Sequence, residues 1–312
     1  MRRTLFFLLI FFIYIVFMGC SIQNQVNMNE EGGGKLFVSS NFGREIICDE
    51  KVKLISGEDV LGLLGKYLKV ETQYGGFIRS INDKKSEGVQ GQQYDWFYYV
   101  NGVASNSSAK AYKLNVADTV FWDYHSWTGA TFIPAIVGAY PEPFVSGFKG
   151  QNNGVLILYA NSAKNEAKKL AGSLERADAK NVEVKIISKD QIVKRNKPTI
   201  VIGLWRELET EQDLKEICSR NIKGGIFAKF SQKGFEFLDF KGDKVEIHNK
   251  DVAAIVATGT GLGDANSLWI ITALDNAGLK QAVDLLEKRP DSIRGFYGIG
   301  IVKEQVVRLP MR

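Results

Sequence analysis

The stretch Tyr94–Gly102, YDWFYYVNG, places five aromatic residues in six consecutive positions and ends in an Asn-Gly pair. Aromatic residues are enriched in strands, and Asn-Gly suits the tight turn of a β-hairpin, so the stretch predicts a strand that runs into a turn. Alternate residues of a strand lie on opposite faces. Trp96 and Tyr98 therefore share one face with Val100, and Phe97 and Tyr99 share the other. One face is expected to be core, and the rings could also stack on a ligand.

A second aromatic segment, VFWDYHSWTG at 120–129, repeats this composition and leads into a stretch with prolines and glycines. Binding groups concentrate where a rigid scaffold meets its loops, so rings near strand ends are the better ligand candidates. The residues predicted to contact a ligand are Tyr99, Tyr124, His125 and Trp127. The indoles of Trp96 and Trp122, further inside the strands, are predicted to be core.

Composition limits the classes of function. The chain has 312 residues, 45% hydrophobic and 24% charged, which is enough for two globular domains. Its charge of +5 is spread along the sequence without a basic block, which excludes nucleic acid as a predicted partner. The chain has only two histidines and no Cys-x-x-Cys spacing, so the sequence does not predict a zinc site. It also contains no nucleophile motif or catalytic constellation, so it does not predict an enzyme. Cys48 and Cys218 are expected to be two separate buried thiols, and no cofactor is predicted.

The N-terminus combines Arg2 and Arg3, an apolar run over 5–17, and Gly19 directly before Cys20. This pattern resembles a bacterial lipoprotein signal peptide. The resemblance implies cleavage after residue 19, a diacylglycerol on Cys20, and a lipid-anchored protein on the extracellular face of the cell membrane. An uncleaved anchor helix is the alternative, but the apolar run is shorter than the roughly 20 residues that span a bilayer.

The signal peptide is predicted to be residues 1–20. A tether and two domains are predicted to follow it. Polar residues and three glycines over 21–35 predict a flexible tether. Residues 36–133 predict a hairpin with its turn near 41–43 and a helix over 56–70 with Ser56 as N-cap. Four further strands are predicted at 76–83, 95–102, 111–118 and 119–125.

The motifs of this first domain resemble a known family. They are the GxDVLxLL helix at 57–64, GGFIxSI at 75–81, DWFYYVNG at 95–102, YxL at 112–114 and ADTVFWxY at 117–124. Together they resemble the bacterial transcobalamin-like C-terminal domain family, which is similar to the small domain of transcobalamin and intrinsic factor. The resemblance implies a compact ubiquitin-like, β-grasp-like fold and ligand binding. In the vertebrate relatives that ligand is cobalamin.

The second half changes its pattern. Pro141 and Pro143 lie in a connector at 134–153, because proline continues neither a helix nor a central strand. Apolar strands then alternate with amphipathic helices over 154–312, which predicts an α/β domain with a mixed sheet and an α+β class for the whole chain. The segment LWIITALDNAGLKQA at 268–282 resembles α/β domains of some prokaryotic surface-layer proteins. GTGLGD at 259–264 could hold a phosphate, but it lacks the P-loop lysine and the helix opening, which favours an ordinary glycine loop.

Three functions compete. The leading hypothesis is a non-enzymatic surface lipoprotein that binds cobalamin or a related corrinoid and supplies it to a membrane transporter. The alternative is a cell-surface adhesion or envelope-structural protein, in which the aromatic strands serve only as core. An unrecognised hydrolase is the third.

Overall fold

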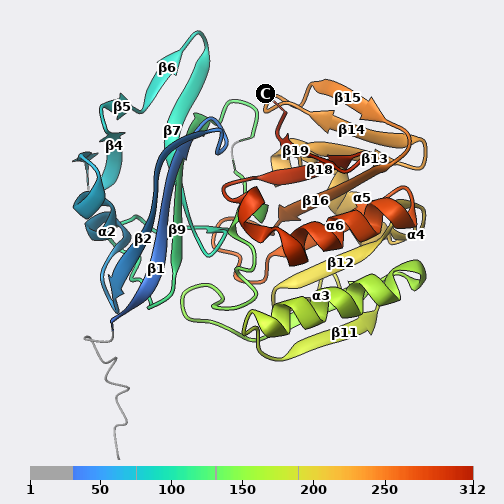
Figure 1. Cartoon of the computed structure of the whole chain (residues 1–312). Helices are drawn as coiled ribbons and strands as arrows, with labels where there is room; N and C mark the ends of the chain where they lie inside the picture. The colour runs from blue at the N-terminus through green and yellow to red at the C-terminus, as the bar shows by residue number, and fades with distance from the viewer. Residues whose placement is uncertain (1–30, 75, 131, 189, 312) are drawn as a thin grey trace, which may run out of the picture.

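The computed structural model describes residues 31–311 except 75, 131 and 189. The predicted signal peptide, Cys20 and residues 21–30 of the predicted tether therefore lie outside the described residues. The chain is β-rich, with mixed sheets and few helices, which confirms the α+β class. Two large sheets lie next to each other in Figure 1, the first at the left and the second at the right.

The first sheet has the strand order β2-β1-β9-β7-β6. Strand β8 also pairs with β7, at the C-terminal end of β7. Strands β1 and β9 are parallel neighbours, whereas β1–β2 and β7–β9 are antiparallel. The parallel pair places the two ends of the domain's sequence side by side in the sheet. The strands are β1 Glu31–Ser40, β2 Glu45–Ile55, β6 Glu87–Val89, β7 Gln92–Val100, β8 Val103–Ala104 and β9 Thr119–Ser126.

Strand β1 begins at Glu31, inside the predicted tether, and pairs with β2 from its first residue. The three glycines belong to this strand, and the sheet is crowded at two of them. A Cβ on Gly32 would lie 2.8 Å from Cβ of Val116. A Cβ on Gly34 would lie 2.3 Å from Cδ1 of Leu54. The polar, glycine-rich composition was therefore a misleading signal, because glycine also marks close approach within a strand.

Helix α2, Val60–Tyr67, packs on one face of this sheet, together with the small sheet β3 Val70–Gln73, β4 Phe77–Ile81 and β5 Lys84–Lys85. Its N-cap is Asp59, whose carboxylate accepts a 2.7 Å bond from the N–H of Gly62, and not Ser56 as predicted. The predicted strand at 111–118 is absent. Apart from one bridge at Lys113 the segment forms turns, and Ala117 has φ 71°.

The second sheet has seven strands in the order β11-β10-β12-β17-β16-β18-β19. The first four are parallel, and β16, β18 and β19 continue the sheet with antiparallel pairing. The strands are β10 Val155–Tyr159, β11 Val182–Ile186, β12 Thr199–Leu204, β16 Val252–Thr258, β17 Leu268–Ala273, β18 Gly298–Val302 and β19 Gln305–Leu309. Near-continuous apolar runs suit strands buried on both faces.

Helices α3, Lys164–Arg176, and α6, Asn276–Lys288, cover one face of this sheet. The other face packs against two short helices and a three-stranded sheet of this half, and against the first domain. These elements are α4 Trp205–Leu208, α5 Gln212–Ser219, β13 Ala228–Ser231, β14 Gly234–Leu238 and β15 Lys244–His248. A 3-10 turn over Asn161–Ala163 precedes α3, and no side chain caps the N-terminus of this helix.

The two halves share one hydrophobic core. Phe37, Tyr99 and Phe121 on the second face of the first sheet belong to the same buried cluster as Val201 and Ile270 of the second sheet. The connector at 134–153 is also mostly buried, and Gly138 N donates a 2.7 Å bond to the carbonyl of Phe296. The predicted boundary therefore separates two sheets and not two independent cores.

Candidate functional site

The site begins with a gap in the pairing of β7. On one side β7 pairs with β9 from Tyr94 to Val100. On the other side it pairs with β6 only up to Tyr94 and with β8 only from Tyr99. On this outer side of the sheet, the edge of β7 between these two short partners, residues 95–98, is therefore open.

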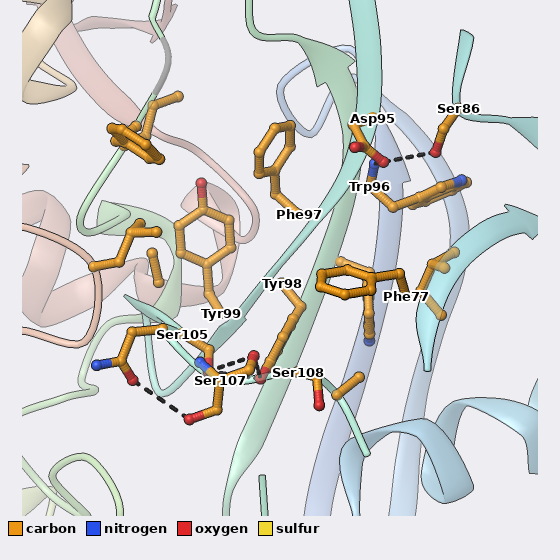
Figure 2. A pocket seen from close by; sticks show the side chains of 18 of the residues that line it. Phe77, Ser86, Asp95, Trp96, Phe97, Tyr98, Tyr99, Ser105, Ser107 and Ser108 are labelled. Carbon is orange, nitrogen blue, oxygen red and sulfur yellow. Dashed lines mark hydrogen bonds between the residues drawn. The ribbon is translucent and has the colours of Figure 1, made fainter. Parts of the chain in front are cut away.

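A cavity of about 430 Å³ surrounds this open edge. Aromatic side chains from both faces of β7 line it, and Figure 2 shows Trp96 and Tyr98 on one side of the strand and Phe97 and Tyr99 on the other. Polar groups lie at its two ends. At one end Ser86 Oγ donates a 2.6 Å bond to Oδ1 of Asp95. At the other the phenol of Tyr98 lies 2.6 Å from both Ser105 Oγ and the Ser107 carbonyl.

Three exposed apolar side chains line the same cavity, and each comes from a different part of the chain. Phe77 on β4 is 65% exposed, Phe132 in the loop after β9 is 54% exposed, and Leu262 of the α/β half is 37% exposed. Single exposed apolar residues are common on protein surfaces. Three around one concave opening are typical of a binding site.

The loop GTGLGD at 259–264 forms the part of the cavity wall that comes from the α/β half. The N–H of Gly263 donates a 2.7 Å bond to the carbonyl of Ala104, and a Cβ on Gly263 would lie 2.5 Å from Cγ of Asn106. Asp264 accepts the N–H of Thr260 and pairs with the buried guanidinium of Arg195 at 2.9 Å. Two of the loop's N–H groups are thus used within the protein, so the glycines serve a close contact between the halves, as in an ordinary glycine loop.

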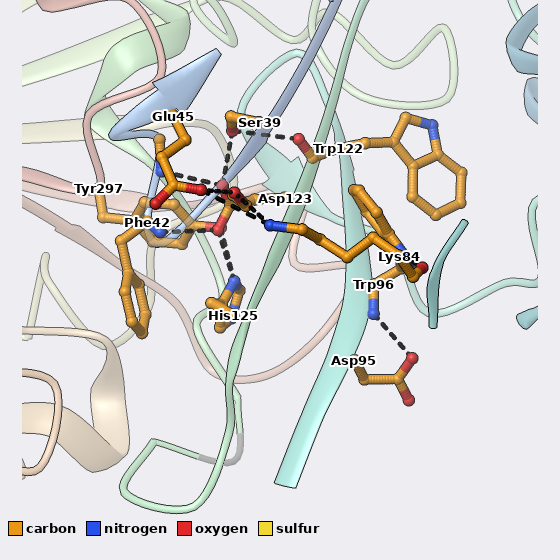
Figure 3. A network of polar contacts seen from close by, with 12 residues as sticks. Ser39, Phe42, Glu45, Lys84, Asp95, Trp96, Trp122, Asp123, His125 and Tyr297 are labelled. Carbon is orange, nitrogen blue, oxygen red and sulfur yellow. Dashed lines mark hydrogen bonds and ion pairs between the residues drawn. The ribbon is translucent and has the colours of Figure 1, made fainter. Parts of the chain in front are cut away.

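Next to the cavity, the buried carboxylate of Asp123 joins β9 to the turn between β1 and β2 (Figure 3). It accepts four hydrogen bonds, of 2.6 Å from Ser39 Oγ, 2.9 Å from the N–H groups of Phe42 and Gly43, and 2.8 Å from Nδ1 of His125. Phe42 and Gly43 have φ of 57° and 77°. The carboxylate therefore holds a left-handed turn that hydrogen bonds within the strands alone would leave unsupported.

His125 is buried between two phenyl rings. Its ring centroid lies 4.5 Å from those of Phe42 and Phe97, and both pairs are stacked. The hydroxyl of Tyr297, from the α/β half, lies 3.3 Å from Nδ1. Burial, followed by the nearby charge of Asp123, raises the pKa of Tyr297 well above its ordinary value, so this phenol keeps its proton. The cluster thus joins the two halves through aromatic rings around one carboxylate.

Two guanidinium groups flank this cluster. Arg308 Nη1 lies 3.3 Å from the carbonyl of Phe42, and Arg44 Nη2 donates to the carbonyl of Pro310. Burial and the like charge of Arg44 lower the pKa of Arg308 to about 10, which leaves it charged at neutral pH. The interface beside Asp123 is therefore closed by polar contacts.

The structure divides the four predicted ligand residues into two pairs. Tyr99 and His125 line the cavity, although both are buried. Tyr124 and Trp127 do not line it. The Tyr124 hydroxyl donates a 2.6 Å bond to the Lys85 carbonyl, and Trp127 is half-buried beyond the end of β9. Trp96 and Trp122 are buried as predicted, and both also form part of the cavity wall.

Phe77, Phe132, Leu262 and the serines at 105–108 were missed by the sequence analysis. They come from segments far apart in the chain, so no local pattern connects them. The available signal was an isolated large apolar residue in a glycine-rich loop, as at Leu262. Such residues are exposed unless another part of the chain or a ligand covers them.

The part of the chain that the structure describes contains no metal-ligand cluster, no disulfide and no membrane-spanning helix. There, no group of three or more His, Cys, Asp and Glu side chains could hold a metal ion. Cys48 and Cys218 are free, as predicted, but Cys48 is only half-buried. Among the described helices none is long and apolar enough to cross a membrane.

Comparison with known proteins gives a partial match. Residues 57–126 match a family described as a domain of unknown function, DUF4430. No functionally curated protein matches the chain. A Ruminococcus gnavus protein described as a candidate metal-binding protein is 15% identical with a TM-score of 0.24, and the match covers 30% of this chain and 97% of that one. Haptocorrin in complex with Cbi is 14% identical with a TM-score of 0.26, covering 34% and 28%.

The family match lies within the first domain, and the two structural matches cover 30% and 34% of this chain. The matched segment at 57–126 contains α2, β7 and all of β9, and therefore much of the cavity wall. The chain spans only 28% of the haptocorrin chain. At TM-scores this low the structural likenesses carry no argument about function.

Proposed function

We propose that this protein is a non-enzymatic binding protein for a small, flat, partly apolar ligand, and that the ligand enters the cavity at the open edge of β7. The observation that carries the proposal is the set of exposed apolar side chains, Phe77, Phe132 and Leu262, around an aromatic cavity. Ligand sites typically combine apolar walls with a few polar groups. This cavity has both, with Asp95 and Ser86 at one end and the serines at 105–108 at the other.

The ligand class that we propose is cobalamin or a related corrinoid. Its ring system has broad apolar faces and polar side groups, which match aromatic walls with polar ends. The volume of about 430 Å³ lies toward the low end of the 300–1,000 Å³ that is usual for drug-sized ligands. A corrinoid would therefore insert one side of its ring and leave the rest outside, against Phe77 and Phe132.

The proposal extends to the fold of the first domain, the attachment of the protein to the membrane, and the destination of the ligand. The parallel central strands β1 and β9 with α2 across one face agree with a β-grasp-like first domain. A lipidated Cys20 would hold the protein on the extracellular face of the membrane, since two acyl chains anchor stably where one does not. From there the protein would supply its ligand to a membrane transporter.

Titration of the full chain, in detergent, with cobalamin and with cobinamide tests the ligand class by absorbance. Phe132→Ala should weaken binding, because it removes an exposed wall of the cavity. Ile247→Ala is the matched control, since Ile247 is 57% exposed on β15 and does not line the cavity. Equal loss in both variants, or flat titrations with wild type, would contradict the proposal.

Adhesion is the second candidate, and one observation favours it. Tyr74, at the turn between β3 and β4, is 90% exposed and lies three residues from Phe77. Aromatic residues are enriched in protein interfaces. Under this alternative Tyr74→Ala would reduce attachment to surfaces while corrinoids fail to bind.

A further inference from the structure

The open edge of β7 presents a defined set of backbone groups. In an antiparallel pair, residues alternate between facing the partner and facing away from it. Asn101 N donates to the carbonyl of Thr119 and Trp127 N donates to that of Gln93, so odd-numbered residues of β7 face β9. The N–H and C=O groups of Trp96 and Tyr98 therefore face the open edge and the cavity.

Two of these four groups already have partners. The N–H of Trp96 donates a 2.7 Å bond to Oδ1 of Asp95, and the C=O of Tyr98 accepts a 3.2 Å bond from the N–H of Ser105. The C=O of Trp96 and the N–H of Tyr98 have no hydrogen bond to any other described residue. One acceptor and one donor are left over, two residues apart on the same edge.

The same cavity wall contains another unpaired donor. Trp122 is 2% exposed, and its Nε1 has no hydrogen-bond partner among residues 31–311 as described. Its ring stacks on that of Tyr98, with centroids 4.9 Å apart. Buried donors without a partner are rare and destabilising, so the groups in this wall are suited to a ligand that brings hydrogen-bonding atoms of its own.

The length of the gap selects what can fill it. It is closed at one end by the pairing of Tyr94 with Glu87 and at the other by the bond between Ser105 and Tyr98. A peptide strand added to an edge needs several consecutive free donors and acceptors. Here a single donor–acceptor pair is available, which matches one amide group.

We propose that the gap in the β7 ladder is a carboxamide-binding subsite: a ligand amide N–H donates to the C=O of Trp96 and the ligand C=O accepts from the N–H of Tyr98. The ligand class is then a flat apolar ring that carries a carboxamide, with its ring against Phe97 or Phe77. This inference rests on the proposed small-ligand function and adds the group by which the ligand is recognised. An ester or a bare hydrocarbon ring of the same shape lacks the donor and should bind more weakly.

The test uses 2-naphthamide and methyl 2-naphthoate, a matched pair of flat neutral probes, with the full chain labelled with ¹⁵N-tyrosine. The amide should shift the backbone N–H resonance of Tyr98 and bind about three- to tenfold more tightly than the ester, as expected for one net hydrogen bond. Tyr98→Phe identifies the resonance, because it removes that label while keeping the backbone. Equal binding of both probes, or no shift at Tyr98, would overturn the subsite.

A variant pair separates the subsite from general damage. Trp122→Phe removes the unpaired donor of the wall and should weaken 2-naphthamide binding about three- to tenfold. Trp269→Phe is the control, since Trp269 is also buried with an unpaired Nε1 but does not line the cavity. Equal weakening in the two variants would count against the subsite. The naphthalene probes contain no corrin ring. Failure of the corrinoid titration would therefore count against the proposed ligand class, whereas failure of the amide preference would count against the subsite.

Discussion

The contact between the two halves has one filled end and one open end. At the filled end Asp123, His125 and Tyr297 are buried and hydrogen-bonded, and phenyl rings enclose them. At the open end, Phe132 and Leu262 are exposed and both line the cavity. Both ends are aromatic, so ring content alone does not distinguish structure from binding. The difference is whether the polar groups among the rings already have partners inside the protein.

The largest expected effect tests the filled end. Asp123→Ala removes a carboxylate that accepts four hydrogen bonds and leaves its donors buried. The free energy of unfolding should fall by about 3–5 kcal/mol, as measured by urea denaturation. Asp95→Ala, at the half-buried open end, should cost less than about 1 kcal/mol. Similar losses would remove the distinction between the two ends.

Two tryptophans on neighbouring segments give the next contrast. Trp122→Ala should lower the free energy of unfolding by about 3–5 kcal/mol, because it empties a large buried site. Trp127 is half-buried, so Trp127→Ala should leave the melting temperature nearly unchanged. Thermal denaturation followed by circular dichroism measures both. Unfolding of the domain by Trp127→Ala without any loss of binding would exclude Trp127 as a ligand contact.

Tyr297→Phe sharpens the comparison within the filled end. The substitution keeps the ring and removes only the hydroxyl that lies 3.3 Å from His125 Nδ1. We expect a loss of about 1 kcal/mol in the free energy of unfolding. Corrinoid or naphthamide affinity should not change, because Tyr297 does not line the cavity. A strong effect on affinity would show that the two ends act together.

The smallest effect concerns pH. Burial raises the pKa of Glu142 in the connector above its ordinary value of 4.5, despite hydrogen bonds from Ser146. The folded state thus holds this proton more tightly than the unfolded state. Protonated Glu142 therefore stabilises the fold below about pH 4.5, and this stabilisation is lost as pH rises through the folded-state pKa. Glu142→Gln should therefore be more favourable, relative to wild type, at pH 7 than at pH 4. Urea denaturation at both pH values measures this, and the opposite sign would contradict it.

The sequence predicted most of the elements because their patterns are local. The aromatic run gave β7, its Asn-Gly turn gave the hairpin with β8, and the apolar runs of the second half gave β10, β12 and β17. The prediction was wrong at 31–35 and 111–118, where glycines lie in a strand and an alternating segment forms turns. In both places tertiary contacts decide the conformation over local preference.

The site was predicted less well, for a physical reason. Tyr99 and His125 were predicted as ligand contacts because they lie near strand ends, and both line the cavity. Phe132 and Leu262 reach it through the packing of two halves, which no periodicity encodes. The second face of β7 was likewise left open as core or platform, and it proved to be buried against the other half except at the cavity.

The loop at 259–264 reaches the cavity through one exposed side chain, Leu262, while Gly263 and Asp264 beside it are fixed by contacts with Ala104 and Arg195. Replacing Leu262 would reshape the entrance and leave both sheets and their shared core as they are. Under the proposed function, single substitutions at this position and at Phe132 would thus change the ligand preference. Among descendants of this chain, variation should concentrate at these two residues, while Gly263 and Asp264 stay constant.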